Sequence, residues 1–403
     1  MSSYVFNTRA ELDTAVNAWI SNQTEAISTY GDINTWDVNA ITDFSNLFKD
    51  KTSFNSNISR WDVSNGTDFS YMFCGAKSFN QDLSSWDVSK GEDFSYLFSA
   101  SLDAPSQFFN YDYKFNQDIS RWDVGSGTNF SGMFKNNDVF NQDISLWDVS
   151  KGTDFSYMFA RADSFDQNIS NWNVGSGTDF SYMFFGNGDS GAVTGSFNPD
   201  ISSWNVSNGV DFSHMFQQNA VFNGDISSWD VGKSNDFSFM FYGARNFNGD
   251  LSSWDVSEGT DFRYMFHTAL IFNSDISNWD VSKGTDFRSM FNFAESFNQN
   301  LKLWDVSESN NFDSMFYSAD NMIANGWNIT PVGTDFLGTL PKISGPSGSA
   351  GATSTSKTLN ENNTNINTFE ANKTVTWSLN GGADASLFSI NSSTGALSFS
   401  SAP

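Results

Sequence analysis

The sequence is short of cysteine, histidine and basic residues. Its 403 residues include one cysteine, Cys74, and two histidines, His214 and His267. A single cysteine excludes an internal disulfide and a zinc site built from cysteines. The 20 Lys and Arg residues stand against 46 Asp and Glu residues, which gives a net charge of −26. A surface of this sign repels phosphate groups, so nucleic acid and anionic lipid headgroups are unfavourable partners.

Long apolar runs and catalytic motifs are also missing. No stretch approaches the roughly 18 apolar residues of a membrane-spanning helix. Residues 1–6 lack the basic and apolar segments of a secretory signal peptide. We therefore expect no membrane span, and a route to any surface that leaves the N-terminus intact. There is no Gly-rich phosphate loop and no metal-protease motif.

Aromatic residues are what the sequence has in excess, with 42 Phe and 14 Trp. A W-[DN]-V motif occurs eleven times, at intervals of 25 residues except for two intervals of 36 and 32. The longer intervals contain insertions of 11 and 7 residues. Self-similarity at a fixed period is the signature of a repeat architecture. The motif tryptophans are Trp36, Trp61, Trp86, Trp122, Trp147, Trp172, Trp204, Trp229, Trp254, Trp279 and Trp304.

Each repeat contains two apolar patterns. Residues 83–88 read L-S-S-W-D-V, and the alternation of Trp and Val is typical of a short strand. Residues 94–98 read F-S-Y-L-F, with apolar residues at i, i+3 and i+4 as on a short helix. Gly91 lies between them, where we expect a positive φ to turn the corner. The pattern predicts an α/β repeat solenoid of parallel short strands and short helices.

Stacking is needed because one repeat cannot bury its own rings. We expect continuous ladders of Trp, Val, Phe and Met or Leu. A further ladder of side-chain amides should satisfy backbone groups at the corner that follows each Phe. Its members are Asn55, Asn80, Asn116, Asn141, Asn198, Asn223, Asn248, Asn273 and Asn298.

The pattern divides the chain into four parts. Residues 1–30 precede the repeats and contain an amphipathic stripe between Ala10 and Ile20, which predicts a capping helix. Residues 31–316 form the solenoid of eleven repeats, and residues 317–341 form a C-terminal cap. Residues 342–403 begin with a Gly- and Ser-rich stretch and then alternate as in an all-β domain. They are fewer than the roughly 100 residues of a β-sandwich, so we expect this domain to continue past Pro403.

Two families are similar to these parts. The phrases F-N-x-D-I-S-x-W-D-V-S and T-D-F-S-x-M-F resemble the 25/26-residue repeat of BspA-like bacterial surface proteins over residues 30–316. This resemblance implies a leucine-rich-repeat-like solenoid, a role in surface adhesion and no shared catalytic residues. Most repeats read Gly-Thr-Asp-Phe where that family commonly has Val-Thr-x-Met. Residues 342–403 resemble the first half of a cadherin-like, immunoglobulin-like repeat, although they contain few of its acidic calcium motifs.

Isolated reactive side chains do not suggest catalysis. His214 and His267 fall at different positions of the repeat, and we expect both to be exposed helix residues. Cys74 is expected to be packed. The many carboxylates are repeat positions, which periodicity explains. We therefore predict that the protein is not an enzyme.

An acidic row is the first candidate site. The residue between Trp and Val points away from the core, and stacking would place its carboxylates about 5 Å apart. Their repulsion must be offset by hydrogen bonds from neighbouring Ser residues, by bound cations such as calcium, or by a partner. The candidate cation ligands are Asp62, Asp87, Asp123, Asp148, Asp230, Asp255 and Asp280.

The two insertions are the second candidate. The first carries Phe108, Phe109, Tyr111 and Tyr113, aromatic residues suited to stacking on a glycan or anchoring a protein. The alternative is that these rings pack back onto the coil. The second insertion contains Asp189 in a Gly-rich run and is a candidate cation loop.

These patterns predict a non-enzymatic extracellular protein on a cell surface or a virion. Its solenoid would act in adhesion, by binding a protein or a glycan. The alternative is a structural subunit that self-associates into an extracellular filament, surface layer or phage fibre. The regular repetition of Ser, Asn and Asp over the coil surfaces favours this alternative. No cofactor is expected apart from the calcium of the acidic row.

Overall fold

The computed structural model describes residues 3–100, 113–186, 197–336, 343–344, 365–368, 370–371, 388–394 and 396–399. The chain divides into two compact units, which are described separately. The first comprises Met1–Leu301 with Glu308–Val332, and the second comprises Lys302–Ser307 with Gly333–Pro403. Among the described residues, no helix is long and apolar enough to cross a membrane.

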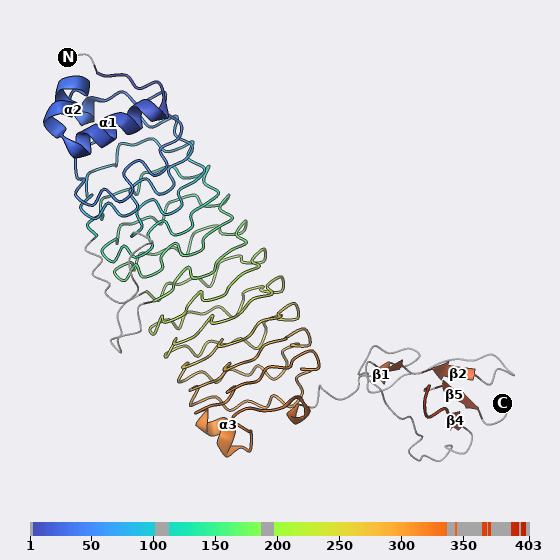
Figure 1. Ribbon diagram of the computed structural model, residues 1–403. Coiled ribbons are helices and arrows are strands. Elements are labelled where there is room, and N and C mark those ends of the chain that lie inside the picture. Colours follow the sequence, from blue (N-terminus) through green and yellow to red (C-terminus); the bar gives the residue numbers. More distant parts are fainter. Residues whose placement is uncertain are drawn as a thin grey trace. The chain divides into compact units, whose positions relative to one another are not determined.

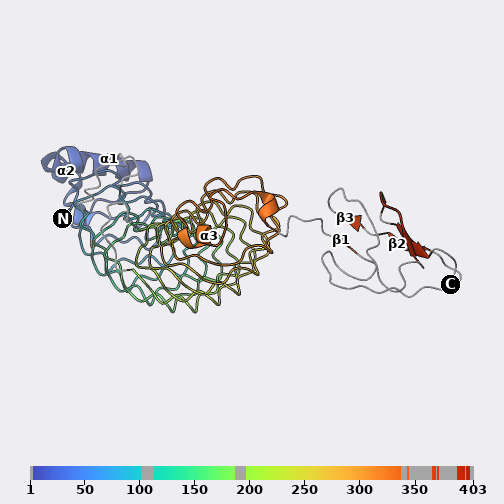
Figure 2. The same ribbon diagram turned by 90° about the horizontal axis from the view of Figure 1, so that it is seen from below.

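The first unit is a stack of coils, one for each repeat (Figure 1). Parallel bridges join equivalent residues of successive coils, from Asp43 with Asp68 to Asp286 with Asn311. Seen from below, the stacked coils follow a curved path (Figure 2). Each coil therefore lies against the next in register, with the period of the sequence repeat.

The backbone of a coil satisfies its hydrogen bonds without a regular helix or strand. In the segment 69–75, every second N–H group donates to a carbonyl of the next coil at 2.8–3.0 Å. The N–H groups of Met72, Cys74 and Ala76 donate three residues back within their own coil, at 3.0–3.2 Å. The remaining N–H, that of Ser70, donates to Asp68 Oδ1 at 2.8 Å. Every N–H group of this segment has a partner, as burial of a polar backbone requires.

The short helix and short strand expected in each repeat are therefore wrong. Residues 94–98 form turns, because Tyr96 has a φ of 54° that no right-handed helix contains. Residues 83–88 form no strand, and the parallel bridges lie instead at the Asp that precedes the first Phe of the turns. Turns closed three residues back place side chains i, i+3 and i+4 on one side, so the apolar pattern resembles that of a helix.

Gly91 also has a different role from the one expected. It does not have a positive φ. A Cβ at this position would lie 2.4 Å from Cζ of Phe94, so the glycine makes room for the ring. Equivalent glycines, such as Gly127 and Gly177, face the ring three residues ahead in the same way.

The core consists of ladders of parallel rings. Phe69 and Phe94 stack with centroids 5.7 Å apart and an interplanar angle of 3°. From Trp61 to Trp279, each motif Trp donates its indole N–H to a carbonyl of the preceding coil, as Trp172 does to Ile144 O at 3.0 Å. The expected Asn ladder is confirmed: Asn55 Oδ1 accepts the Asn80 N–H at 2.9 Å, and later coils repeat this bond.

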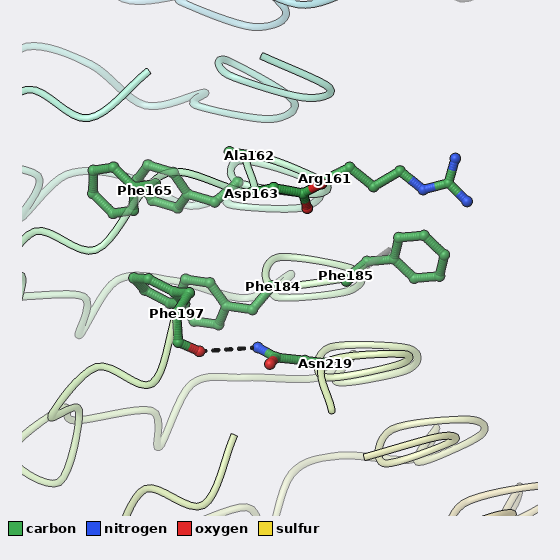
Figure 3. A pocket seen from close by; sticks show the side chains of 10 residues that line it. Arg161, Ala162, Asp163, Phe165, Phe184, Phe185, Phe197 and Asn219 are labelled. Atoms are coloured by element: carbon green, nitrogen blue, oxygen red, sulfur yellow. Dashed lines mark hydrogen bonds between the residues drawn. The ribbon is translucent and has the colours of Figure 1, made fainter. Parts of the chain in front are cut away.

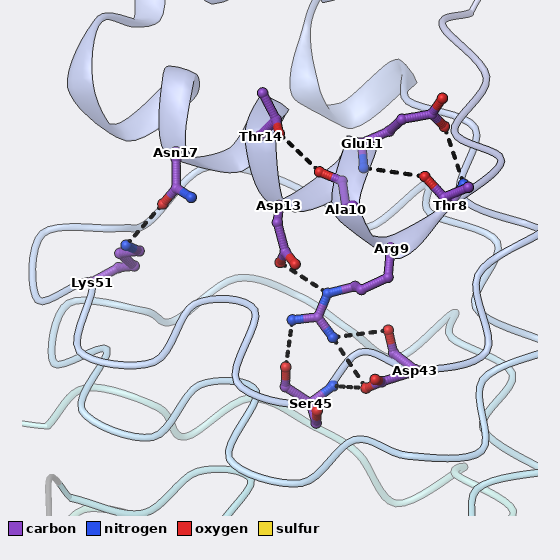
Figure 4. A network of polar contacts seen from close by, with 10 residues as sticks. All are labelled: Thr8, Arg9, Ala10, Glu11, Asp13, Thr14, Asn17, Asp43, Ser45 and Lys51. Carbon is purple, nitrogen blue, oxygen red and sulfur yellow. Dashed lines mark hydrogen bonds and ion pairs between the residues drawn. The ribbon is translucent and has the colours of Figure 1, made fainter.

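The segment before the first repeat is helical. Helix α1 spans Arg9–Ser21, starts with a capping box, and is followed by α2 at Gln23–Tyr30 and the 3₁₀ helix η1 at Ile33–Thr35. The guanidinium of Arg9 donates to Asp43 of the first coil, and Lys51 Nζ lies 3.1 Å from Asn17 Oδ1 (Figure 4). The helix therefore covers the first coil. Ile20, expected on the buried stripe, is 37% exposed.

The far end of the first unit is also covered. Helix α3 spans Asp320–Ala324. The chain then turns back, so that Ser314 N donates to Thr330 Oγ1 at 3.0 Å and Phe316 N donates to Ile329 O at 2.9 Å. In earlier coils the equivalent N–H groups donate to the next coil; here residues 329–330 accept these two hydrogen bonds instead.

The described strands of the second unit are antiparallel. β1 (Ile343–Ser344) pairs with β3 (Glu370–Ala371), and β5 (Ala396–Phe399) lies between β2 (Asn365–Thr368) and β4 (Phe388–Ile390). The 3₁₀ helix η3 at Gly333–Asp335 precedes them. The rest of the predicted all-β domain, including Trp377, lies outside the described residues.

Candidate interaction surface

The carboxylate oxygens of the exposed acidic row accept hydrogen bonds from the backbone. In every described member from Asp62 to Asp280, Oδ1 accepts the N–H of the residue two ahead at 3.0–3.1 Å. Hydrogen bonds to Ser64 and Ser150 lower the pKa of Asp62 and Asp148 below the usual value. No group of three or more His, Cys, Asp or Glu side chains able to hold a metal ion occurs in the described part of the chain. Asp189 lies outside it.

The insertion residues give no exposed aromatic cluster in the described part of the chain. Phe108, Phe109 and Tyr111 lie outside the described residues. Tyr113 is 3% exposed, so its ring is packed into the coil and is not available for stacking on a ligand.

The two histidines are not the exposed helix residues expected from the sequence. His214 lies between two rings, with centroids 4.0 Å from Tyr182 and 4.5 Å from Phe239. Burial lowers the pKa of His214, and it lowers the pKa of His267 to about 4. Both side chains are therefore neutral parts of aromatic rows at neutral pH. Cys74 is buried, as expected.

His214 belongs to a row of half-buried rings on the outside of the coils, which we call the aromatic stripe. Each member is the x of F-S-x-M-F or its variant, and each has a φ of 54–60°. The repeat alignment contains the signal for it, because this position is aromatic in most coils. The members are Tyr71, Tyr96, Tyr157, Tyr182, His214, Phe239 and Tyr264.

The rings of the stripe stack face to face from coil to coil. Tyr71 and Tyr96 form one pair with centroids 4.8 Å apart. The five rings from Tyr157 to Tyr264 form a second run with centroids 4.0–4.7 Å apart and interplanar angles of 8–16°. The two runs are separated by the coil of Gly132, where a Cβ would lie 2.4 Å from the Tyr96 ring.

Basic side chains cover the ends of both runs. Lys49 Nζ lies 5.0 Å from the Tyr71 centroid. Lys135 Nζ lies between the runs, 5.8 Å from the Tyr96 centroid and 3.9 Å from that of Tyr157. Arg288 lies 6.0 Å from the Tyr264 centroid. The ring faces are thus occupied by other rings or by cations, and a partner would meet ring edges and phenol hydroxyls.

A second row of aromatic side chains widens the stripe in the later coils. Tyr242 stacks on His267 with centroids 4.5 Å apart, and Phe293 meets Tyr317 edge-on at 5.5 Å. Phe293 and Tyr317 are 40% and 47% exposed. Further back, the Arg161 guanidinium lies 5.1 Å from the Phe185 centroid. This second row ends as an exposed apolar edge.

A second acidic row runs beside the stripe, three residues before each ring in the chain. Its Asp side chains are half-buried, and their Oδ1 atoms accept the N–H two residues ahead, as at Asp154 and Asp211. Burial, assisted by neighbouring carboxylates, raises the pKa of Asp154 and of Asp211. In later coils Arg263 and Arg288 form ion pairs with the Asp two residues before them.

The repeats that contain these rows match a known family. The model of the family described as "Mycoplasma protein of unknown function, DUF285" matches residues 14–104, 101–191, 190–270 and 250–336. The chain belongs to the DUF285 family. No curated protein and no solved structure matches it. The matched segments cover the repeats and leave out the strands β1 to β5 of the second unit.

A small cavity lies within the DUF285 repeats. A cavity of about 20 Å³, room for one water, lies beside Phe165, Phe184 and Phe197 (Figure 3). Asn219 closes one side by donating to Phe197 O at 3.3 Å, and Asn137 donates to Phe115 O at 3.2 Å in the same way. Both Asn residues lie in the coil after an insertion, so they repair hydrogen bonding there rather than form a ligand site.

Proposed function

We propose that this DUF285 chain is a non-enzymatic protein-binding module of an extracellular surface, and that the aromatic stripe is its interaction face. The supporting observation is where the coil surfaces vary. The two acidic rows and the Asn ladder repeat Asp or Asn, whereas the stripe position reads Asn, Tyr, Tyr, Gly, Tyr, Tyr, His, Phe, Tyr, Ser, Ser. A face that recognises one partner has to differ from coil to coil, and this row and the one beside it do so.

The chemistry of the stripe favours a protein over a glycan. Sugars stack on the faces of aromatic rings, and here the faces are covered by neighbouring rings or by Lys49, Lys135 and Arg288. Tyr, Phe and Arg are the residues enriched at the centre of protein interfaces. The two aromatic rows concentrate them on a surface otherwise rich in Ser and Asp.

Backbone strain supports the same face. A left-handed residue other than glycine costs roughly 1–2 kcal/mol, and strained residues cluster at functional sites. Gly132 occupies the stripe position in one coil, so the backbone accepts glycine there. Seven coils nevertheless have an aromatic residue or histidine at this position. Stacking offsets part of the cost, and partner binding is the function that we assign to the exposed edges.

The resemblance to BspA-like repeats supports an adhesive role for a solenoid at a cell surface, and the cadherin-like segment fits the same setting. The regular Ser, Asn and Asp rows favour the alternative of a filament subunit. Growth by adding coils end to end is opposed by α1 over the first coil and by residues 329–330 at the last. We therefore place adhesion first.

A display library of unselected peptides tests this function. Binders are selected on the whole chain after counter-selection on a stripe variant, Tyr182→Ser with Phe239→Ser, which keeps the net charge of −26. Ser289 and Ser314 show that Ser is accepted at this position. Leu146→Ser, at an 86% exposed residue away from the stripe, is the matched control.

We expect binders that require the stripe and that still bind the control variant. If no peptide distinguishes the stripe variant from the native chain, the stripe is not the interaction face and the proposed function fails.

A further inference from the structure

The partner of the aromatic stripe can be assigned a charge. We propose that the middle of the stripe binds a basic polypeptide segment, whose Arg or Lys side chains meet the carboxylates beside the rings while its other atoms pack on the ring edges. This inference rests on the proposed function and specifies its partner. The carboxylates form the central acidic row, which consists of Asp154, Asp179, Asp211 and Asp236.

Rings and carboxylates are in the same four coils and in the same register. Each Asp lies three residues before a stripe member: Tyr157, Tyr182, His214 and Phe239. Parallel bridges join Asp154 to Asp179, Asp179 to Asp211, and Asp211 to Asp236. At about 4.8 Å per coil, the double row extends roughly 14 Å. An extended segment of about four or five residues has this length.

The central acidic row differs from its continuation. In the next two coils the Asp side chains have intramolecular cations: Arg263 Nε lies 3.2 Å from Asp261 Oδ2, and Arg288 Nη2 lies 2.9 Å from Asp286 Oδ2. In the central coils the corresponding residues are Ser, whose N–H groups bond to Oδ1 at 2.8–2.9 Å. Among the described residues, no ion pair to the central row occurs. A cation supplied by a partner would take the place that Arg263 and Arg288 fill in the later coils.

Charge selects a basic partner over a second copy of the chain. Two chains of net charge −26 repel each other, whereas a basic segment is attracted over a distance and correctly oriented by complementary charge. The long stems of Arg and Lys also pack on apolar surface while their charged ends reach carboxylates. Ring edges beside half-buried carboxylates suit both parts of such side chains.

The test uses two fluorescent twelve-residue peptides, one alternating Arg and Gly and the other alternating Glu and Gly. Binding to the whole chain is measured by fluorescence anisotropy at physiological ionic strength. The acidic-row variant replaces Asp154, Asp179, Asp211 and Asp236 with Asn. Asn129 occupies the same row and accepts the same N–H at 3.0 Å, so the substitution keeps the turn.

The matched control makes the same charge change in the exposed row, with Asp62, Asp87, Asp148 and Asp255 replaced by Asn. Asn173 and Asn205 occupy that row naturally and keep its hydrogen bond. Circular dichroism and melting curves check that both variants are folded.

We expect the Arg peptide to bind and the Glu peptide not to bind. The acidic-row variant should weaken binding at least tenfold, and the control variant less than threefold. Equal weakening in both variants, or no binding of the Arg peptide, would overturn the inference. The peptides selected on the stripe separate the two proposals: stripe-dependent binders without Arg or Lys leave the proposed function standing and reject the basic partner.

Discussion

The inner Phe ladders and the aromatic stripe are built by the same stacking but have opposite relations to solvent. Phe241 stacks on Phe266 with centroids 5.5 Å apart and is 0% exposed. Phe239, two residues earlier, stacks on Tyr264 at 4.7 Å and is half-buried. The inner position of Phe241 is Phe in every coil, whereas the outer position varies. The difference indicates that stacking alone does not determine the residue type. Burial restricts the inner position to Phe, whereas the half-buried outer position tolerates several residue types.

The strongest way to break this comparison is to truncate one ring of each kind in the same coil. Phe241→Ala should reduce the free energy of unfolding by about 3–5 kcal/mol, because it opens a cavity in the core. Phe239→Ala should cost about 1 kcal/mol, since it removes stacking contacts at the surface. Urea denaturation followed by Trp fluorescence measures both. Equal costs would mean that the stripe is part of the core.

The glycine row sharpens the account of the inner ladders. Gly177→Ala places a Cβ 2.4 Å from Cζ of Phe180 and should cost about 1–3 kcal/mol by overpacking. Three coils have another residue at this position: Ile41, Ser234 and Ser309. Two residues after Ser234, the Phe212 N to Asp236 O distance is 3.4 Å. Ser234→Gly should raise the melting temperature. A rise with Gly177→Ala would show that the ring has room to move.

The strain of a left-handed backbone conformation can be relieved by a substitution that leaves the aromatic rings unchanged. Thr268 is β-branched and has a φ of 59°, while Gly243 and Gly75 occupy the same position in other coils. Thr268→Gly should stabilise the chain by about 0.5–1 kcal/mol, because it removes steric strain that exceeds the loss of one hydroxyl contact. Chemical denaturation measures the change. A loss of stability would mean that the hydrogen bond between Thr268 and His267 contributes more free energy than the backbone strain costs.

The two acidic rows should respond oppositely to pH. Hydrogen bonds lower the pKa of Asp148, so its charged form adds stability above pH 3.8 that is lost as the pH falls through its lower folded value. Burial raises the pKa of Asp154, so it favours folding below pH 3.8 and this contribution is lost as the pH rises through its higher folded value. At neutral pH, Asp148→Asn should lower the melting temperature slightly and Asp154→Asn should raise it.

Both differences should shrink as the pH falls, the Asp154 difference first and the Asp148 difference later, because the folded Asp148 carboxyl has the lower pKa and is protonated last. Melting curves at neutral pH and at about pH 3 measure them. The same sign for both variants at neutral pH would contradict the assignment of environments.

The sequence predicted the repeats but not their backbone. The spacing of Trp61, Trp86 and their equivalents defined the coils, and the Asn ladder followed from the position of Asn55 and Asn80. The prediction of a short helix was wrong because Tyr71 has a left-handed backbone conformation. Gly and Asn commonly adopt that conformation and Tyr rarely does, so a Tyr at this position does not indicate it. The aromatic stripe was missed because a position predicted to lie on a short helix gives no reason to stack its side chains from coil to coil.

The sequence by itself determined the period, the aromatic core, the caps and the acidic surface, because each of these depends on residue type and spacing alone. Only the tertiary structure decided which rings face solvent and which carboxylates lie beside them. Those properties depend on hydrogen bonds between coils about 25 residues apart, such as Tyr71 N to Ser95 O at 2.8 Å. These bonds hold the backbone in a conformation that local preferences do not favour, and in doing so they turn one row of rings outward beside a row of carboxylates.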